Sequence, residues 1–301
     1  MSRFRLFSFA CVLSAISLAA TPGFAQDASS TITVTGQKLK KKMAKRQSLE
    51  FVSKYTTRQE NQFARRTVPS CVRVIGIDAP YAAIVQDKVN AVGKAAGLMI
   101  GGGACKPNLN ILFTNDGNAL MSQFRKVRPS LFNDVELRKR RELYNNAVPV
   151  RWWYINNIIE ADDYKSTARA NADGTASIID RTVVSPFIST GIVIDISGTV
   201  VIVDIEQAEG YPLESIAAYA AMVSFAQLRP NGITDGSSSI MSMFNQATNL
   251  GNAPLDLTNF DYAYIRGLYD ILPDRIGGSQ RGRIASKMAA RLSNTDIQGR
   301  K

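Results

Sequence analysis

The 301-residue chain contains no histidine. Histidine is the commonest metal ligand and the side chain that titrates most readily near neutral pH. Its absence excludes a Ser-His-Asp triad, a Cys-His nucleophile and any zinc site built on imidazole. The chain also lacks a long uninterrupted apolar run after its first 25 residues, so we expect no membrane-spanning helix there.

The first 25 residues have the layout of a cleavable export signal. Arg3 and Arg5 give a positive start, residues 6–20 are apolar, and Gly23 and Ala25 are the small residues that precede a cleavage site. The apolar run is short for a membrane span and a Pro-Gly pair follows it, which favours cleavage near Ala25 over an anchor. The sequence therefore predicts a periplasmic or secreted protein without a transmembrane segment after cleavage.

Only two of the three cysteines, Cys71 and Cys105, follow this signal. An even pair of cysteines in an oxidising compartment predicts a disulfide. Residues 71–77 and 108–114 alternate like strands, and Pro80 opens a helical pattern between them. A right-handed β-α-β crossover would make these strands parallel neighbours and bring the two cysteines together.

Positive charge concentrates in residues 37–66, which hold ten Lys or Arg residues and two Glu residues. We therefore expect a basic, largely flexible arm over residues 26–66 and a single α+β domain over residues 67–301. Such an arm favours contact with an anionic surface, and a solvated linker is the alternative. Aromatic residues are sparse there, so specific nucleic-acid binding is not expected. The candidate contact residues are Lys40, Lys41, Lys42, Lys45 and Arg46.

A short segment of the arm, residues 31–37, reads Thr-Ile-Thr-Val-Thr-Gly-Gln. Its alternating β-branched residues favour an extended conformation. The segment resembles the TonB-box region of outer-membrane TonB-dependent receptors, a short peptide that pairs with a periplasmic energy-coupling protein. An ordinary N-terminal linker is the alternative.

The last third of the chain has a distinctive order of elements. Residues 192–196 and 199–205 predict a β-hairpin around Ser197-Gly198. Residues 213–228 are apolar on nearly every side, which indicates a helix buried in the centre of a domain. A Ser-Ile-Met turn at residues 239–241 follows, and Thr258 with Asp261 marks the capped start of a helix that runs to Leu-Tyr at residues 268–269. A last amphipathic helix is predicted over residues 280–292.

This order resembles the catalytic half of the metzincin zinc peptidases. They carry His-Glu-x-x-His-x-x-Gly-x-x-His on a central helix, then a Ser-Ile/Val-Met turn and a Leu-Thr-x-x-Asp helix that ends in Leu-Tyr. The resemblance covers about 60 residues and implies a zincin-like α+β fold with a mixed twisted sheet, a buried central helix and C-terminal helices. In the matching register, the ligand positions hold Tyr219, Val223 and Arg229.

The departures from this family remove its chemistry. Ala220 stands where the family has its catalytic glutamate, and an alanine cannot act as a general base. Val223 offers no lone pair to zinc. Only Met241, which shapes the floor below the metal in the family, keeps its identity, and core packing is its expected role here. We therefore expect no metal, no cofactor and no peptidase activity.

The resemblance implies an inactive peptidase scaffold that binds an extended peptide or an envelope protein. We expect the peptide to add as a strand in a cleft beside residues 199–205. A structural envelope protein without a cleft is one alternative. The other is a hydrolase that uses paired carboxylates, for example on cell-wall glycan. The candidate carboxylates for it are Asp162, Asp163, Asp195, Asp204, Glu206, Glu209 and Glu214.

Overall fold

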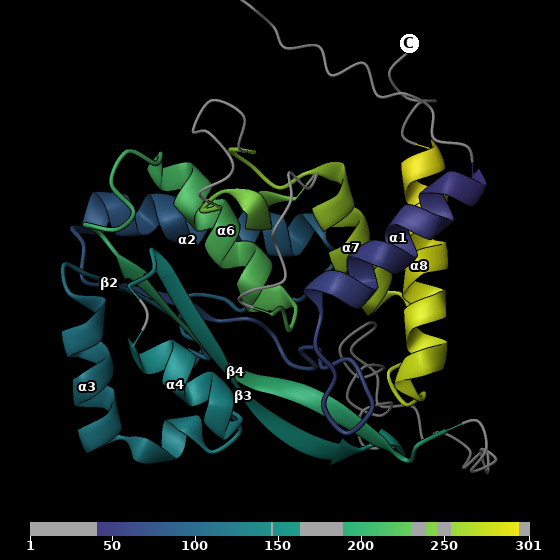
Figure 1. The fold of residues 1–301 in the computed structure, drawn as a ribbon, viewed down its shortest axis with the longest axis horizontal. Helices are drawn as coiled ribbons and strands as arrows, with labels where there is room; N and C mark the ends of the chain where they lie inside the picture. The colour runs from purple at the N-terminus through teal and green to yellow at the C-terminus, as the bar shows by residue number, and fades with distance from the viewer. Residues whose placement is uncertain (1–40, 146, 163–188, 230–238, 246–253, 295–301) are drawn as a thin grey trace, which may run out of the picture. The chain divides into compact units, whose positions relative to one another are not determined.

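The computed structural model describes residues 41–145, 147–162, 189–229, 239–245 and 254–294. Within these ranges the chain forms a mixed α/β fold, with one four-stranded sheet in the order β1-β2-β4-β3 and seven α-helices (Figure 1). The predicted export signal, the TonB-box-like segment and Lys40 lie outside the described residues. No helix of the described part is long and apolar enough to cross a membrane.

The β-α-β unit predicted from the sequence is confirmed. Strands β1 (Val72–Ile75) and β2 (Leu109–Thr114) are parallel neighbours, and helix α2 (Ala79–Ala95) connects them. The apolar stripe of α2 is buried at Val85, Val89 and Val92. Gly97 follows the helix with a φ of +82°, a conformation that favours glycine after a helix end.

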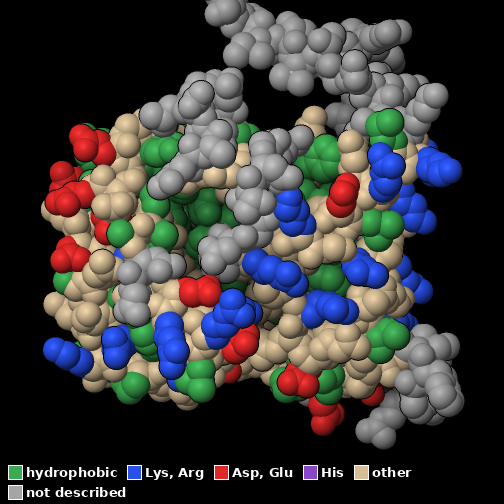
Figure 2. Space-filling model, in the orientation of Figure 1, with side chains coloured by type: hydrophobic (Ala, Val, Ile, Leu, Met, Phe, Trp, Pro, Cys, Tyr) green, Lys and Arg blue, Asp and Glu red, His purple; other side chains and the backbone are tan. Residues whose placement is uncertain are grey.

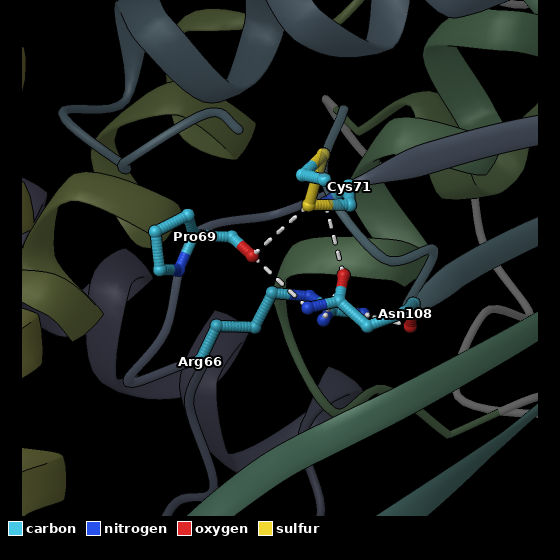
Figure 3. Close-up of a disulfide and its surroundings, with 5 residues drawn as sticks. Arg66, Pro69, Cys71 and Asn108 are labelled. Carbon is cyan, nitrogen blue, oxygen red and sulfur yellow. Dashed lines mark hydrogen bonds between the residues drawn. A yellow bond between two sulfur atoms is a disulfide. The ribbon is translucent and has the colours of Figure 1, made fainter. Parts of the chain in front are cut away.

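The disulfide between Cys71 and Cys105 is also confirmed, with 5.9 Å between the two Cα atoms. Figure 3 shows Asn108 beside it. The Asn108 Oδ1 atom accepts a hydrogen bond from the Cys71 backbone N–H at 2.9 Å, and its Nδ2 atom donates to the Pro69 carbonyl at 3.0 Å. One side chain thus holds the starts of β1 and β2 together next to the disulfide.

Replacing Cys71 and Cys105 by serine is expected to lower the free energy of unfolding by roughly 4 kcal/mol, because the disulfide closes a loop with a sequence separation of 34. Urea titrations of the wild type with and without reductant should show the same loss. The double variant, which has no disulfide, should not respond to reductant. Identical urea midpoints for the wild type and the variant would contradict the expectation.

The predicted hairpin at Ser197-Gly198 is wrong. Residues 192–204 form one continuous strand, β4 (Ile192–Asp204), which pairs antiparallel with β3 (Val150–Glu160) and parallel with β2. The Ser-Gly pair lies where the pairing shifts register, with Gly198 opposite Ile155 and Ile196 opposite Asn156. The pair forms a bulge instead of a turn because β3 pairs with the chain before and after Ser197, at Ile196 and Gly198.

Helices cover both faces of the sheet (Figure 1). On one face, α2 and α6 (Leu213–Phe225) pack together, and α6 is buried from Ser215 to its end, as predicted for a central helix. On the other face lie α3 (Gly117–Val127), the 3-10 turn η1 (Pro129–Phe132) and α4 (Leu137–Asn145). The 3-10 turn η2 (Ile240–Ser242) and helices α7 (Asn259–Tyr269) and α8 (Gly277–Asn294) complete the described C-terminal part.

Residues 41–66 belong to the packed body, although the charge pattern placed them in an arm. Helix α1 (Lys41–Tyr55) packs along α8 and buries Phe51 and Val52. Arg65 and Arg66 are also buried. The side chains of Lys41, Lys42, Lys45 and Arg46 are exposed. The folded body therefore begins well before Thr67.

Candidate functional site

A cavity of about 500 Å³ opens beside the outer edge of β3. One wall comes from the middle of α6, from the segment after this helix and from η2, through Tyr219, Leu228 and Met241 respectively. The opposite wall comes from α4 and the residues before it. Figure 2 shows a hollow with hydrophobic side chains on this side of the molecule, bordered by charged side chains. A cavity of this size can hold a small ligand or one large side chain.

Within the described part of the chain, the floor of the cavity is an unpaired sheet edge. Among the described strands, β3 pairs only with β4. The Asp204 N–H of β4 donates to the Pro149 carbonyl. In an antiparallel pair, every second residue of a strand directs its N–H and C=O groups to the partner strand, so Arg151 and Trp153 direct theirs to β4. The peptide groups of Val150, Trp152 and Tyr154 therefore point away from the sheet, toward the cavity.

The open stretch ends at Asn156. Its outward N–H donates to the Oδ2 atom of Asp134 at 3.0 Å. Asp134 thus accepts the hydrogen bond that would continue the edge, and within the described residues the unpaired outward peptide groups are those of Val150, Trp152 and Tyr154. A short edge can pair with a few residues of another chain and no more.

Five aromatic side chains line the cavity, and the charged side chains of Asp134, Glu136, Lys139, Glu142 and Arg151 line it as well. The ring of Tyr219 packs edge-on against Trp152 and Phe244, with centroid distances of 5.9 and 5.0 Å. Trp153 extends from the opposite face of the sheet and packs on Phe132 at 5.0 Å. Trp152 and Trp153 are the two tryptophans of the chain, and both line the cavity. The site therefore favours an apolar ligand group.

The former ligand positions of the metzincin-like register are separated. Tyr219 lines the cavity together with Met241, and burial raises the pKa of the Tyr219 hydroxyl above its ordinary value. Ala220 and Val223 are fully buried and do not line the cavity. Arg229 is exposed, because α6 ends at Phe225 and the chain continues extended. The structure thus brings Tyr219 and Met241 together and leaves the other three positions elsewhere.

Tyr154 holds the C-terminal end of α6 against β3. Its hydroxyl lies 2.8 Å from the carbonyl oxygens of both Val223 and Ala226, and it accepts a hydrogen bond from the Leu228 N–H at 3.1 Å. Burial raises the pKa of this hydroxyl, so it stays neutral. The contact joins residues 69 to 74 positions apart, so no local sequence pattern predicts it, and it fixes one wall of the cavity on its floor.

Asp261 connects the Ser-Ile-Met turn to the helix that follows it. Its carboxylate accepts hydrogen bonds from the Ser239 hydroxyl at 2.5 Å and from the Ile240 N–H at 2.9 Å. It also accepts from the N–H and the hydroxyl of Thr258, which completes the predicted capping box. Burial raises the pKa of Asp261, and the four hydrogen bonds oppose that shift. The carboxylate thereby positions Met241 at the cavity.

Arg66 ties the end of α6 to the sheet. Its guanidinium donates to the Ser224 carbonyl of α6 and to the Thr199 hydroxyl of β4, at 3.3 and 2.7 Å. It also donates to the Oδ1 atom of Asn108, beside the disulfide (Figure 3). Burial lowers the pKa of Arg66, and nearby Tyr269 and Asp195 oppose that change. Sequence reasoning missed this residue because it counted Arg66 within the basic arm.

Two of the carboxylates named for a hydrolase, Asp195 and Asp204, lie too far apart to act as a pair. Asp195 and Asp204 lie nine residues apart on β4, which places them about 30 Å apart. Asp195 accepts from Thr67, and Asp204 accepts from the Gly117 N–H. Asp162, Glu206, Glu209 and Glu214 are exposed, and Asp163 lies outside the described residues.

Among the described side chains, no three Cys, Asp or Glu residues lie close enough together to hold a metal ion. The chain was also compared with known families, curated proteins and solved structures. No protein family, curated protein or solved structure matches it.

Proposed function

We propose that this protein binds a short extended peptide along the free edge of β3, without cleaving it. The observation that carries the proposal is an open strand edge beside an aromatic cavity. An extended peptide can add to such an edge through main-chain hydrogen bonds, and a pocket for one side chain supplies specificity. The ligand strand lies beside β3, not beside residues 199–205 as first expected, because β4 is paired on both sides.

The proposal also draws on the resemblance to metzincins. We propose that the chain is an exported peptidase-like scaffold that has lost its zinc ligands and keeps its substrate cleft for binding. Support comes from the Tyr219 and Met241 side chains, which lie together at the cavity. Further support comes from the contact of Asp261 with the Ser-Ile-Met turn. The partner would be a peptide segment of an envelope protein.

A fluorescence titration tests the proposal directly, because both tryptophans line the cavity. The probes are capped pentapeptides Ala-Thr-Xaa-Thr-Ala in which Xaa is Gly, Val, Leu or Phe. Burying a large apolar side chain contributes about 1.5–3 kcal/mol, so the Phe peptide should bind at least about tenfold more tightly than the Gly peptide. Equal affinity across the four peptides would contradict an apolar side-chain pocket.

The backbone part of the proposal has its own test. Two versions of the Phe peptide carry N-methyl groups on alternate amides, in opposite phases. Only one phase faces β3, so one version should lose most of its affinity and the other should keep it. If both versions bind like the parent peptide, the ligand does not pair with the strand edge.

Variants locate the binding site. Phe244→Ala is expected to weaken binding of the Phe peptide about tenfold, because Phe244 packs on Tyr219 in the cavity. Phe260→Ala is the matched control, since Phe260 is also partly buried but packs on Phe51 of α1. Stoichiometric zinc in the purified protein, or peptide cleavage abolished by a chelator, would contradict the inactive scaffold.

A further inference from the structure

Helices α1 and α8 place a large excess of positive charge on one surface. Helix α1 contains five Lys or Arg residues and one acidic residue, Glu50. Helix α8 contains four Lys or Arg residues and no acidic residue. The two helices pack along each other, and Figure 1 shows them side by side. Together they carry nine cationic side chains against one anionic side chain.

Most of these charges point to solvent. On α1, Lys41, Lys42, Lys45 and Arg46 are exposed. On α8, Arg281, Arg283 and Lys287 are exposed, whereas Arg291 is paired with Asp270. We call these seven exposed residues the two-helix basic face. Figure 2 shows Lys and Arg side chains gathered over this part of the molecule. The sequence separates the two halves by more than 230 residues, and only the fold joins them.

We infer that the two-helix basic face docks the protein on an anionic phospholipid surface. Each Lys or Arg near such a surface adds to the attraction, and cations spread over two helices match a plane of headgroup phosphates. Met43, which is 45% exposed among the α1 lysines, adds an apolar contact at the interface. The apolar side of α1 is buried in the fold, so the contact is electrostatic rather than inserted.

The composition of the face favours a lipid surface over a single-stranded nucleic acid. Single-stranded nucleic acid binds on platforms that combine cations with aromatic rings for base stacking. The aromatic residues of α1, Phe51 and Tyr55, are buried in the core, and α8 contains none. The face therefore presents charge without a stacking surface.

The test is co-sedimentation of the full chain with vesicles of phosphatidylcholine that contain phosphatidylglycerol. Vesicles of phosphatidylcholine alone are the lipid control. We expect binding only to the anionic vesicles, and loss of binding near 1 M NaCl, where the Debye length falls to about 3 Å. Arg283→Glu with Lys287→Glu should weaken binding at least about tenfold, as should Lys42→Glu with Lys45→Glu.

The matched control is Lys106→Glu with Lys126→Glu, which makes the same charge change at exposed positions outside the face. It should bind nearly as well as the wild type. All variants share residues 1–40, so differences between them report on the face. The inference is overturned if the control loses as much binding as the α8 pair. It is also overturned if the α8 pair binds normally, or if a DNA duplex binds more tightly than the vesicles at equal salt.

Discussion

Asp261→Ala is expected to lower the free energy of unfolding by about 5 kcal/mol, the largest effect that we predict. Asp261 is fully buried and accepts four hydrogen bonds, from Ser239, Ile240 and twice from Thr258. Each buried donor left without an acceptor costs about 1–3 kcal/mol. The variant removes the acceptor of all four donors and also breaks the cap of α7. Urea unfolding followed by circular dichroism measures the loss.

Two further variants make this expectation specific. Asp261→Asn keeps the shape and one oxygen but adds donors, so its loss should be about half as large. Asp256→Ala removes an exposed carboxylate that pairs with Lys88 and accepts from the Leu257 N–H, and its loss should stay below about 1 kcal/mol. If Asp261→Ala were as mild as Asp256→Ala, the contact between the turn and α7 would not stabilise the fold.

Arg66→Met should lower the free energy of unfolding by about 4 kcal/mol. Methionine fills much of the same volume but cannot donate to Ser224, Thr199 or Asn108. It also leaves the buried carboxylate of Asp195 without its neighbouring cation. Removing one member of a buried charged network costs about 3–5 kcal/mol. A urea titration again provides the measurement.

Arg46→Ala is the control for Arg66→Met, because it removes an exposed cation from the same basic segment. Its effect should lie within about 0.5 kcal/mol of zero. Equal effects of the two substitutions would mean that Arg66 behaves as a surface residue. If only Arg66→Met lowers the free energy of unfolding, the basic segment contains both a buried residue that stabilises the fold and exposed residues that do not.

Local signals predicted the β-α-β unit correctly. Pro80 fixes the first turn of α2, and the valines at residues 85, 89 and 92 follow the helical period. The right-handed crossover through α2 makes β1 and β2 parallel neighbours. Cys71 and Cys105 precede these strands, so the crossover brings them close enough for a disulfide. Thr258 and Asp261 likewise marked the start of α7. In each case the deciding residues are close in sequence.

The failures come from partners that lie far apart in sequence. Ser197-Gly198 carries a turn signal, but β3 pairs with Ile196 and Gly198 and keeps the chain extended, and β2 pairs from Thr199 onward. Because β4 pairs with β2 and β3, the edge of the sheet is β3 and not β4. The cleft predicted beside residues 199–205 therefore lies beside β3 instead. Arg66 has the charge of an arm residue, and composition does not report burial. Asp261 was recognised as a cap, but its bonds to Ser239 and Ile240 cross more than 20 residues.

The length of the free edge of β3 also bears on self-association. An open strand edge can template the addition of identical chains and so start a fibre. Here, Asp134 accepts the hydrogen bond of the Asn156 N–H. Within the described residues, this leaves three residues whose peptide groups point away from β4, namely Val150, Trp152 and Tyr154. So short a template supports few intermolecular hydrogen bonds, and α4 and α6 flank it on both sides. The geometry allows one short peptide of another protein to pair with β3 and disfavours fibre formation by repeated addition of this chain.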